Sequence, residues 1–248
     1  MKKILIAFDG LSYSEDFAAF AIKIAKASNS LLVGVFLRNP KKIHNSIERF
    51  TNQCVESGIY FKVHVNKGVL LSELLHESTF ADLIMIDTQT NLFNLNDHKV
   101  SSVLKDLLIE ASCPVLIVPK ITKEIKNVFI AYDGSESSVL AMKMFSYLFP
   151  EWNELNTTIL SVSKSSSNHL PKNSNIKDLS KQHFKNMKYK VLNGDASEVL
   201  IDYLKKNNEQ SVVVMGSYGR NAISRMIHSS LSHKVINDAK IPVFISHQ

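Results

Sequence analysis

The two halves of this 248-residue sequence are variants of one another. Four short landmarks from the first half recur in the second, in the same order and at offsets of 124–128 residues. They are KILIAFDG at 3–10 and NVFIAYDG at 127–134, Gly68 and Gly194, Ser101-Ser102 and Ser229-Ser230, and CPV at 113–115 and IPV at 241–243. Because chance would scatter such matches, we interpret the chain as one domain duplicated with small insertions.

Two domains of about 120 residues each lie within the usual size range of folding units. We predict them at residues 1–120 and 126–248, on either side of the charged stretch PKITKEIK at 119–126. With 45% hydrophobic and 21% charged residues, the chain carries enough apolar side chains to build cores. Global disorder is therefore not expected.

Each half alternates short apolar runs of strand length with helical segments. Strands are predicted at 3–8, 31–37, 60–65, 82–86 and 115–118, and at 127–132, 157–162, 188–192, 211–215 and 243–246. The clearest helices are predicted at 14–27, 136–148, 196–207 and 229–238. This alternation predicts an α/β fold of two tandem Rossmann-like domains, each a five-stranded parallel sheet with helices on both faces.

Two local signals add detail to the second half. Asp195 precedes a helical run and Glu198 follows three residues later, which predicts a capping box. The polar stretch at 163–175 breaks the alternation and is interpreted as a loop. This loop follows the second predicted strand of its half, so it either overhangs a ligand crevice or is a solvated insertion.

Composition argues against several other classes of protein. The net charge is +6 and the pI about 9.1, but the basic residues are spread without a basic run, so nucleic-acid binding is not expected. Cys54 and Cys113 lie far apart and the nine histidines are scattered, so neither a disulfide framework nor a metal site is predicted. No apolar run approaches the ~20 residues that span a bilayer, and the run after Met1 is too short for a signal peptide. A cytoplasmic protein without membrane contact is expected.

Ligands of open parallel sheets bind at the carboxyl ends of the strands, where the strand order reverses. In the second half, Ala131, Tyr132 and Asp133 end the first predicted strand and precede a glycine turn. A carboxylate at this tip can accept hydrogen bonds from ribose hydroxyls. The alternative is that Asp133 only caps the following helix.

A second segment of this half reaches the same edge. Met215 and Gly216 end a predicted strand, and Gly219 follows in a GxxG pattern. The next helix is predicted to begin at Ser229, Ser230, Leu231 and Ser232. Glycine lets backbone approach a phosphate closely, and the free amides of a helix start favour an anion.

The segment Gly216-x-x-Gly219-x9-Ser229-Ser230 resembles the GxxGx9G[ST] signature of ATP-binding universal stress proteins, and the resemblance covers the chain as two copies. It implies an adenine nucleotide alpha hydrolase-like fold that binds ATP or another adenine nucleotide, with Mg²⁺ accompanying a bound triphosphate. The implied nucleotide-binding residues are Ala131, Tyr132, Asp133, Val162, Met215, Gly216, Tyr218, Gly219, Ser229, Ser230, Leu231 and Ser232. Ser229 departs from the glycine of the signature and adds a side chain beside the phosphate.

The first half departs further from this signature. Its corresponding strand tip reads Asp87-Thr88-Gln89-Thr90, with no glycine and with a carboxylate where a phosphate would approach. Two such charges repel by about 1 kcal/mol at 4 Å in water and by more in a crevice. We therefore predict that the first domain carries a degenerate nucleotide motif.

The function implied by the resemblance is that of a regulatory protein of the stress response, binding nucleotide in its second domain. Neither a nucleophile–base pair nor paired carboxylates are evident, so the chain is not predicted to be an enzyme beyond slow ATP hydrolysis or serine autophosphorylation. An adenylate-transferring α/β enzyme is disfavoured, because neither half carries an SGGxDS loop after its first strand.

The alternative is a tandem stress protein that binds no nucleotide and acts through dimerisation or client interaction. The runs at 115–118 and 243–246 are predicted to meet edge to edge, so that the two domains pair within the chain. A homodimer of such chains is a further expectation.

Overall fold

The computed structural model describes residues 2–8, 13–37, 40–66, 70–88, 102–119, 124–164, 168–216 and 234–246. The chain divides into two compact units, Met1–Thr122 and Lys123–Gln248. This division falls inside the charged stretch at 119–126. Within the described residues, no helix is long and apolar enough to cross a bilayer.

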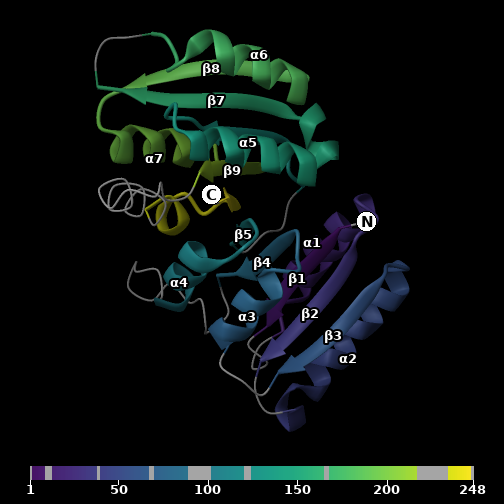
Figure 1. The fold of residues 1–248 in the computed structure, drawn as a ribbon. Helices are drawn as coiled ribbons and strands as arrows, with labels where there is room; N and C mark the ends of the chain where they lie inside the picture. Colours follow the sequence, from purple (N-terminus) through teal and green to yellow (C-terminus); the bar gives the residue numbers. More distant parts are fainter. Residues whose placement is uncertain are drawn as a thin grey trace. The chain divides into compact units, whose positions relative to one another are not determined.

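The first unit is a parallel five-stranded sheet with helices between its strands (Figure 1, purple to teal). Its strand order is β3-β2-β1-β4-β5, and each neighbouring pair is parallel. Its strands are β1 (Lys3–Phe8), β2 (Leu31–Leu37), β3 (Phe61–Asn66), β4 (Leu83–Asp87) and β5 (Val115–Val118). Its helices are α1 (Glu15–Ala27), α2 (Pro40–Ser57), α3 (Leu70–Ser78) and α4 (Ser102–Glu110).

The second unit repeats this topology (Figure 1, teal to yellow). Its strand order is β10-β9-β6-β7-β8, again with parallel neighbours. Its strands are β6 (Asn127–Ala131), β7 (Asn156–Ser163), β8 (Asn186–Asn193), β9 (Ser211–Gly216) and β10 (Val243–Ser246). Its helices are α5 (Glu136–Leu148), α6 (Asn173–His183) and α7 (Ala196–Lys206), with a 3-10 turn, η2 (Pro150–Glu154). In both units the strand order reverses beside the first strand.

Helices cover both faces of the sheet in each unit. Strand side chains alternate between faces, so residues of odd and even number along β1 point to opposite sides. Phe8 contacts Phe17 of α1 and Phe50 of α2, with ring centroids 6.1 and 5.6 Å apart. On the opposite face, the Lys3 ammonium pairs with the Glu77 carboxylate of α3 at 2.7 Å. The first sheet therefore lies between α1–α2 and α3.

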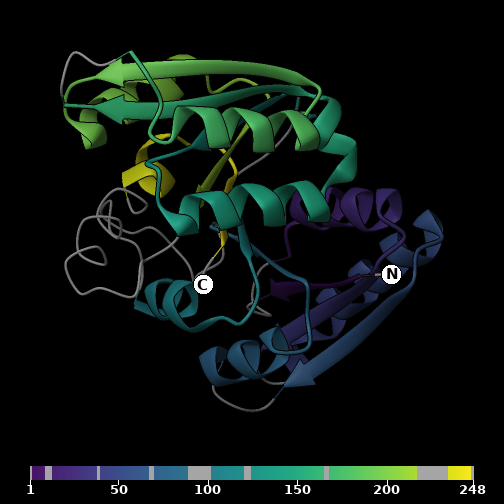
Figure 2. The same ribbon diagram turned by 45° about the horizontal axis from the view of Figure 1, so that its top comes forward.

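The second sheet has the same layers (Figure 2). The rings of Phe129 in β6 and Tyr203 in α7 lie 5.7 Å apart on one face. On the other face, Phe145 of α5 packs on Phe244 of β10 at 5.3 Å. The predicted α/β class is thus confirmed, and the strands β4, β5 and β10 are buried on both faces.

All ten predicted strands are present, with ends within two residues of those predicted. Of the four predicted helices, three match α1, α5 and α7, whereas only residues 234–238 of the fourth lie in the described helical part. The loop predicted at 163–175 is partly wrong, because β7 continues to Ser163 and α6 begins at Asn173. Helix α6 was missed because only Ile176 and Ser180 are buried along it. So sparse an apolar face gives no visible helical period.

The cap predicted for α7 is present. Asp195 is its N-cap, and a carboxylate oxygen accepts the Ser197 backbone N–H at 2.9 Å. The Ser197 hydroxyl donates to the same oxygen at 2.6 Å, and these hydrogen bonds lower the pKa of Asp195. The described hydrogen bonds include none that the Glu198 carboxylate accepts, so the second hydrogen bond of the capping box is not observed.

Candidate functional site

A pocket of about 130 Å³ lies at the carboxyl ends of β6, β7 and β9 and beneath the first turns of α7. The strand register places Ala131, Leu160 and Met215 on the α7 face of the sheet. All six predicted site residues within the described ranges line this pocket: Ala131, Tyr132, Asp133, Val162, Met215 and Gly216. The remaining predicted residues, Tyr218, Gly219, Ser229, Ser230, Leu231 and Ser232, lie outside the described residues.

The turn after β6 positions the polar edge of the pocket. Gly134 has φ +84°, a conformation that side chains disfavour, and a Cβ there would lie 2.7 Å from Pro171. Asp133 accepts the Ser135 backbone N–H on its carboxylate at 2.9 Å. Ser135, not Asp133, is the N-cap of α5, and its hydroxyl accepts the Ser138 N–H at 3.2 Å. The helix-capping alternative for Asp133 is therefore wrong, and its exposed carboxylate belongs to the turn at the pocket edge.

Tyr132 contributes to the pocket in a different way from its neighbours. Its backbone N–H donates to the Leu160 carbonyl at 2.8 Å and so continues the hydrogen bonding between β6 and β7. Its side chain is 3% exposed, and the hydroxyl donates to the Pro171 carbonyl at 3.1 Å, just before α6. Burial, assisted by the nearby Asp133 charge, raises the pKa of this hydroxyl. The ring thus anchors the turn to the α6 side of the sheet, which leaves the backbone of Tyr132 to line the pocket.

Gly216 lies where the tip of β9 meets the start of α5. A Cβ at this position would lie 2.5 Å from the Ser137 carbonyl carbon and 2.6 Å from the Ser138 nitrogen. Both contacts are with helix backbone, which cannot rotate away as a side chain can. Packing alone therefore requires glycine here, and the glycine of the GxxG pattern is not by itself evidence of a phosphate.

Several lining residues were not predicted from the sequence. Of these, Leu160, Ala196 and Leu200 form apolar walls together with the predicted Val162 and Met215. The side chains of Ser135, Ser137 and Ser138 add a polar rim, with the first two hydroxyls 3.0 Å apart. Ala196 and Leu200 could have been found from their four-residue spacing on the apolar face of α7. The three serines could not have been predicted, because they line the pocket only where β9 packs closely against the start of α5.

The corresponding place in the first unit is built differently. The strand registers make Asp87 of β4 the equivalent of Gly216, because each ends its strand opposite the last strand of its sheet. The Asp87 side chain is 2% exposed. Phe8 stands where the second unit has Tyr132, and it stacks on Phe36 at 4.8 Å. A buried carboxylate thus replaces the glycine of the strand tip.

Reactive groups elsewhere offer little chemistry. The Ser146 hydroxyl lies 2.8 Å from His183 Nδ1, but Ser146 is buried and also donates to the Lys143 carbonyl at 2.8 Å, which fits a structural role. Burial raises the pKa of both cysteine thiols, Cys54 and Cys113, to about 12, so neither is a thiolate at neutral pH. Among the described residues there is no cluster of three or more His, Cys, Asp and Glu that could hold a metal ion.

Part of the chain matches a known protein family. The model of the Universal stress protein family matches residues 150–247. A search of curated proteins found no match to the sequence. The predicted resemblance is thus confirmed for residues 150–247, which match the universal stress protein family.

Solved structures extend the likeness of fold to the whole chain. A universal stress protein from Archaeoglobus fulgidus DSM 4304 is 17% identical, with a TM-score of 0.69 over 99% of this chain and 98% of that one. A candidate universal stress protein from Pseudomonas aeruginosa UCBPP-PA14 is 15% identical, with a TM-score of 0.71 over 100% and 93%. The cytoplasmic domain of a prokaryotic cation chloride cotransporter is 11% identical, with a TM-score of 0.57 over 99% and 95%. At these identities the likeness defines the fold alone, and the third structure illustrates that one fold hosts different functions.

Proposed function

We propose that the chain is a tandem universal stress protein that binds ATP or another adenine nucleotide in its second unit. The observation that carries this proposal is the convergence of six sequence-predicted residues, from three strand tips, on one pocket. The pocket lies where strand order reverses at the carboxyl edge of a parallel sheet, the usual ligand position in such folds.

The shape and chemistry of the pocket suit the adenosine end of a nucleotide. Leu160, Val162, Leu200 and Met215 offer apolar walls to a flat base. Asp133, exposed at the edge, can accept hydrogen bonds from ribose hydroxyls. At about 130 Å³ the pocket is smaller than the ~300–1,000 Å³ usual for small-molecule sites. We assign the base to this volume, and the phosphates, with Mg²⁺, to Gly219 and Ser229–Ser232.

The proposed role is regulatory and cytoplasmic, without a demanding catalytic cycle. Among its described lining residues, the pocket has one carboxylate and no histidine or cysteine, so these residues offer no acid–base pair. The first unit, with Asp87 at its strand tip, is proposed to bind no ATP. Pairing of the two units through β5 and β10, and a homodimer of the chain, remain predictions.

A second candidate function is that of an interaction protein without nucleotide. It is favoured by Ser229, which replaces the glycine of the signature, and by the packing role of Gly216, which explains that glycine without a ligand. The two proposals differ in one observable, namely whether ATP binds to the purified chain.

Replacing Asp133 with alanine is expected to weaken ATP binding by about 10- to 100-fold. A hydrogen bond to a charged group contributes roughly 1.5–3 kcal/mol, and each 1.4 kcal/mol is a factor of ten. The measurement is calorimetric titration with ATP and Mg²⁺. Because Ser135 caps α5, the helix is expected to remain intact in this variant.

Asp133→Asn is the matched control, since its amide oxygen can still accept the Ser135 N–H of the turn. It should fold like the wild type and bind ATP with intermediate affinity. If Asp133→Ala binds ATP as tightly as the wild type, this carboxylate does not contact the ribose and the assignment of the pocket is wrong.

A further inference from the structure

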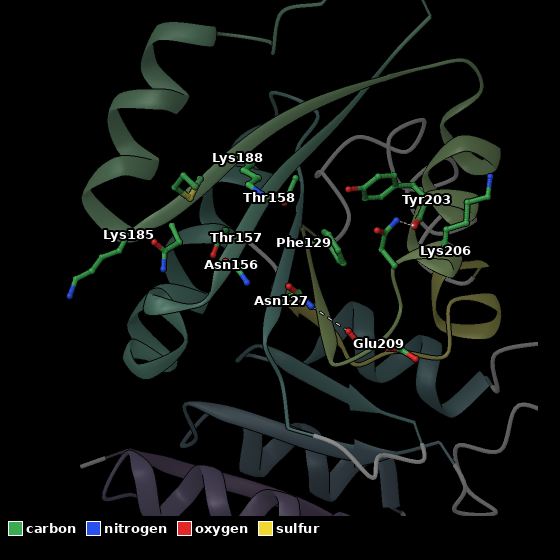
Figure 3. Close-up of a pocket in the computed structure, with 13 residues that line it drawn as sticks. Asn127, Phe129, Asn156, Thr157, Thr158, Lys185, Lys188, Tyr203, Lys206 and Glu209 are labelled. Atoms are coloured by element: carbon green, nitrogen blue, oxygen red, sulfur yellow. Dashed lines mark hydrogen bonds between the residues drawn. The ribbon is translucent and has the colours of Figure 1, made fainter.

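The second unit has another hollow, at the opposite end of its sheet. This cleft of about 830 Å³ is lined by the amino-terminal residues of β6, β7 and β8 and by the last turn of α7 (Figure 3). Parallel strands all begin at one edge of a sheet and end at the other. The cleft is therefore separate from the pocket at Ala131–Asp133, with which it shares no lining residue.

Two rows of side chains cross the sheet inside this cleft. The strand register places Asn127, Asn156 and Asn186 side by side on neighbouring strands. The Asn127 and Asn186 amide nitrogens donate to the main-chain carbonyls of Glu209 and Glu154, at 3.4 and 2.6 Å. Each bond uses one of the two N–H donors of its amide, so the carbonyl oxygen and the second N–H can bind a ligand. Such a row suits a ligand that carries several hydroxyl groups.

The second row is Phe129, Thr158 and Lys188, next along the same three strands. Figure 3 shows Phe129 near Tyr203 of α7, with Thr158 on the neighbouring strand and Lys188 beyond Thr158. The rings of Phe129 and Tyr203 meet nearly at right angles, 5.7 Å apart, and Phe129 is buried. The cleft thus has an aromatic floor beneath polar side chains.

The charge around this cleft is mainly positive. Lys185 is paired with Glu154 at 2.6 Å and points away from the cleft in Figure 3. Lys188 and Lys206 also line the cleft, and Glu209 is the one acidic residue among its described lining residues. Lys190 follows Lys188 by two residues on the same face of β8, and its ammonium nitrogen lies 4.6 Å from the centre of the Tyr203 ring. Within the described part of the chain, neither Lys188 nor Lys190 forms an ion pair. These ammonium groups therefore remain available to an anion.

The first unit provides an internal comparison for this surface. Its registers place Lys62 and His64 of β3 where the second unit has Lys188 and Lys190. There the Glu77 carboxylate of α3 forms an ion pair with the Lys3 ammonium at 2.7 Å and lies 3.4 Å from His64 Nδ1. The Lys3 charge is therefore neutralised within the unit. The first unit thus places a carboxylate beside His64, the equivalent of Lys190, whereas no described carboxylate pairs with Lys190 in the second unit.

Lysines on an edge strand also discourage edge-to-edge pairing between molecules. That role accounts for Lys188 and Lys190 on β8, which ends the second sheet. It does not account for Lys206, which is on α7, or for Asn127 and Asn156, which are on the inner strands β6 and β7.

We propose that this cleft binds a small phosphorylated polyol, such as a sugar phosphate. Lys188 and Lys190 hold the phosphate, the asparagine row binds hydroxyl groups, and Phe129 with Tyr203 forms the apolar floor. The site does not depend on nucleotide binding at the other edge of the sheet.

The test is an NMR titration of the full chain labelled with nitrogen-15. The probes are glucose 6-phosphate, inorganic phosphate and glucose, at low salt because screening weakens exposed charges. We expect saturable shifts of the Asn127 and Asn156 side-chain amides with glucose 6-phosphate, weaker binding of phosphate and none of glucose. A Lys188→Gln/Lys190→Gln variant should weaken glucose 6-phosphate binding at least about tenfold, the factor that corresponds to 1.4 kcal/mol.

The matched control is Lys177→Gln/Lys181→Gln on α6, which removes the same charge from the other face. It is well matched because Lys177 also lies over a tyrosine ring of β8, 5.4 Å from the centre of Tyr189. The control should bind glucose 6-phosphate within twofold of the wild type. Equal losses in the two double variants, no saturable shift, or loss of binding in Asp133→Ala would each overturn the proposal.

Discussion

Replacing Gly216 with alanine is expected to destabilise the second unit by about 1–3 kcal/mol, the usual cost of overpacking. The added Cβ would lie 2.5–2.6 Å from three backbone atoms of Ser137 and Ser138. The start of α5 must then move away from the tip of β9, which displaces the serine rim of the pocket. We therefore also expect ATP affinity to fall. Chemical denaturation measures the first effect and calorimetric titration the second.

Gly58 offers a control for this substitution. It has φ +65°, and a Cβ there would have no neighbour within 4 Å. Asparagine tolerates this conformation better than other side chains, so Gly58→Asn should change stability little. If Gly216→Ala is as stable as the wild type, the close packing of β9 on α5 is not a feature of the folded chain.

Replacing Phe50 with alanine is expected to destabilise the first unit by about 3–5 kcal/mol. Phe50 is fully buried on α2, and its ring lies 5.6 Å from that of Phe8 and 5.7 Å from that of Phe36. Truncation leaves a cavity among rings that two strands hold in place. The measurement is the loss of free energy of unfolding in denaturant.

Val55 on the same helix is the control for Phe50. It is 63% exposed, so Val55→Ala should change stability by no more than about 0.5 kcal/mol. Because the proposed nucleotide pocket is built from second-unit residues only, ATP affinity should be unchanged in folded Phe50→Ala. A variant that loses ATP binding while still folded would place part of the site in the first unit.

The sheet could be predicted from sequence because its strands carry their own signal. Runs such as 83–87 and 211–216 are largely apolar and buried, as central parallel strands require. The same succession of strands along the chain recurs in both halves, which supports each assignment. Helices with one sparse buried face carry less signal. Helix α2 buries only Ile43, Phe50 and Cys54 among its described side chains, and no helix was predicted there.

The candidate site divides in the same manner. The strand tips at Ala131, Val162 and Met215 could be predicted because parallel topology brings carboxyl ends together. The part played by Gly216 could not, since its reason is a backbone contact between β9 and α5. Nor could the direction of the Tyr132 ring, which depends on Pro171, far away in sequence.

Calorimetric titration of the intact chain with ATP and Mg²⁺ tests the central claim most directly. The account predicts one saturable site per chain, because the second unit has the pocket and the first has buried Asp87 at the equivalent strand tip. Two equal sites would show that the first unit is not degenerate. The absence of both binding heat and a thermal shift would contradict the nucleotide proposal and favour the interaction protein.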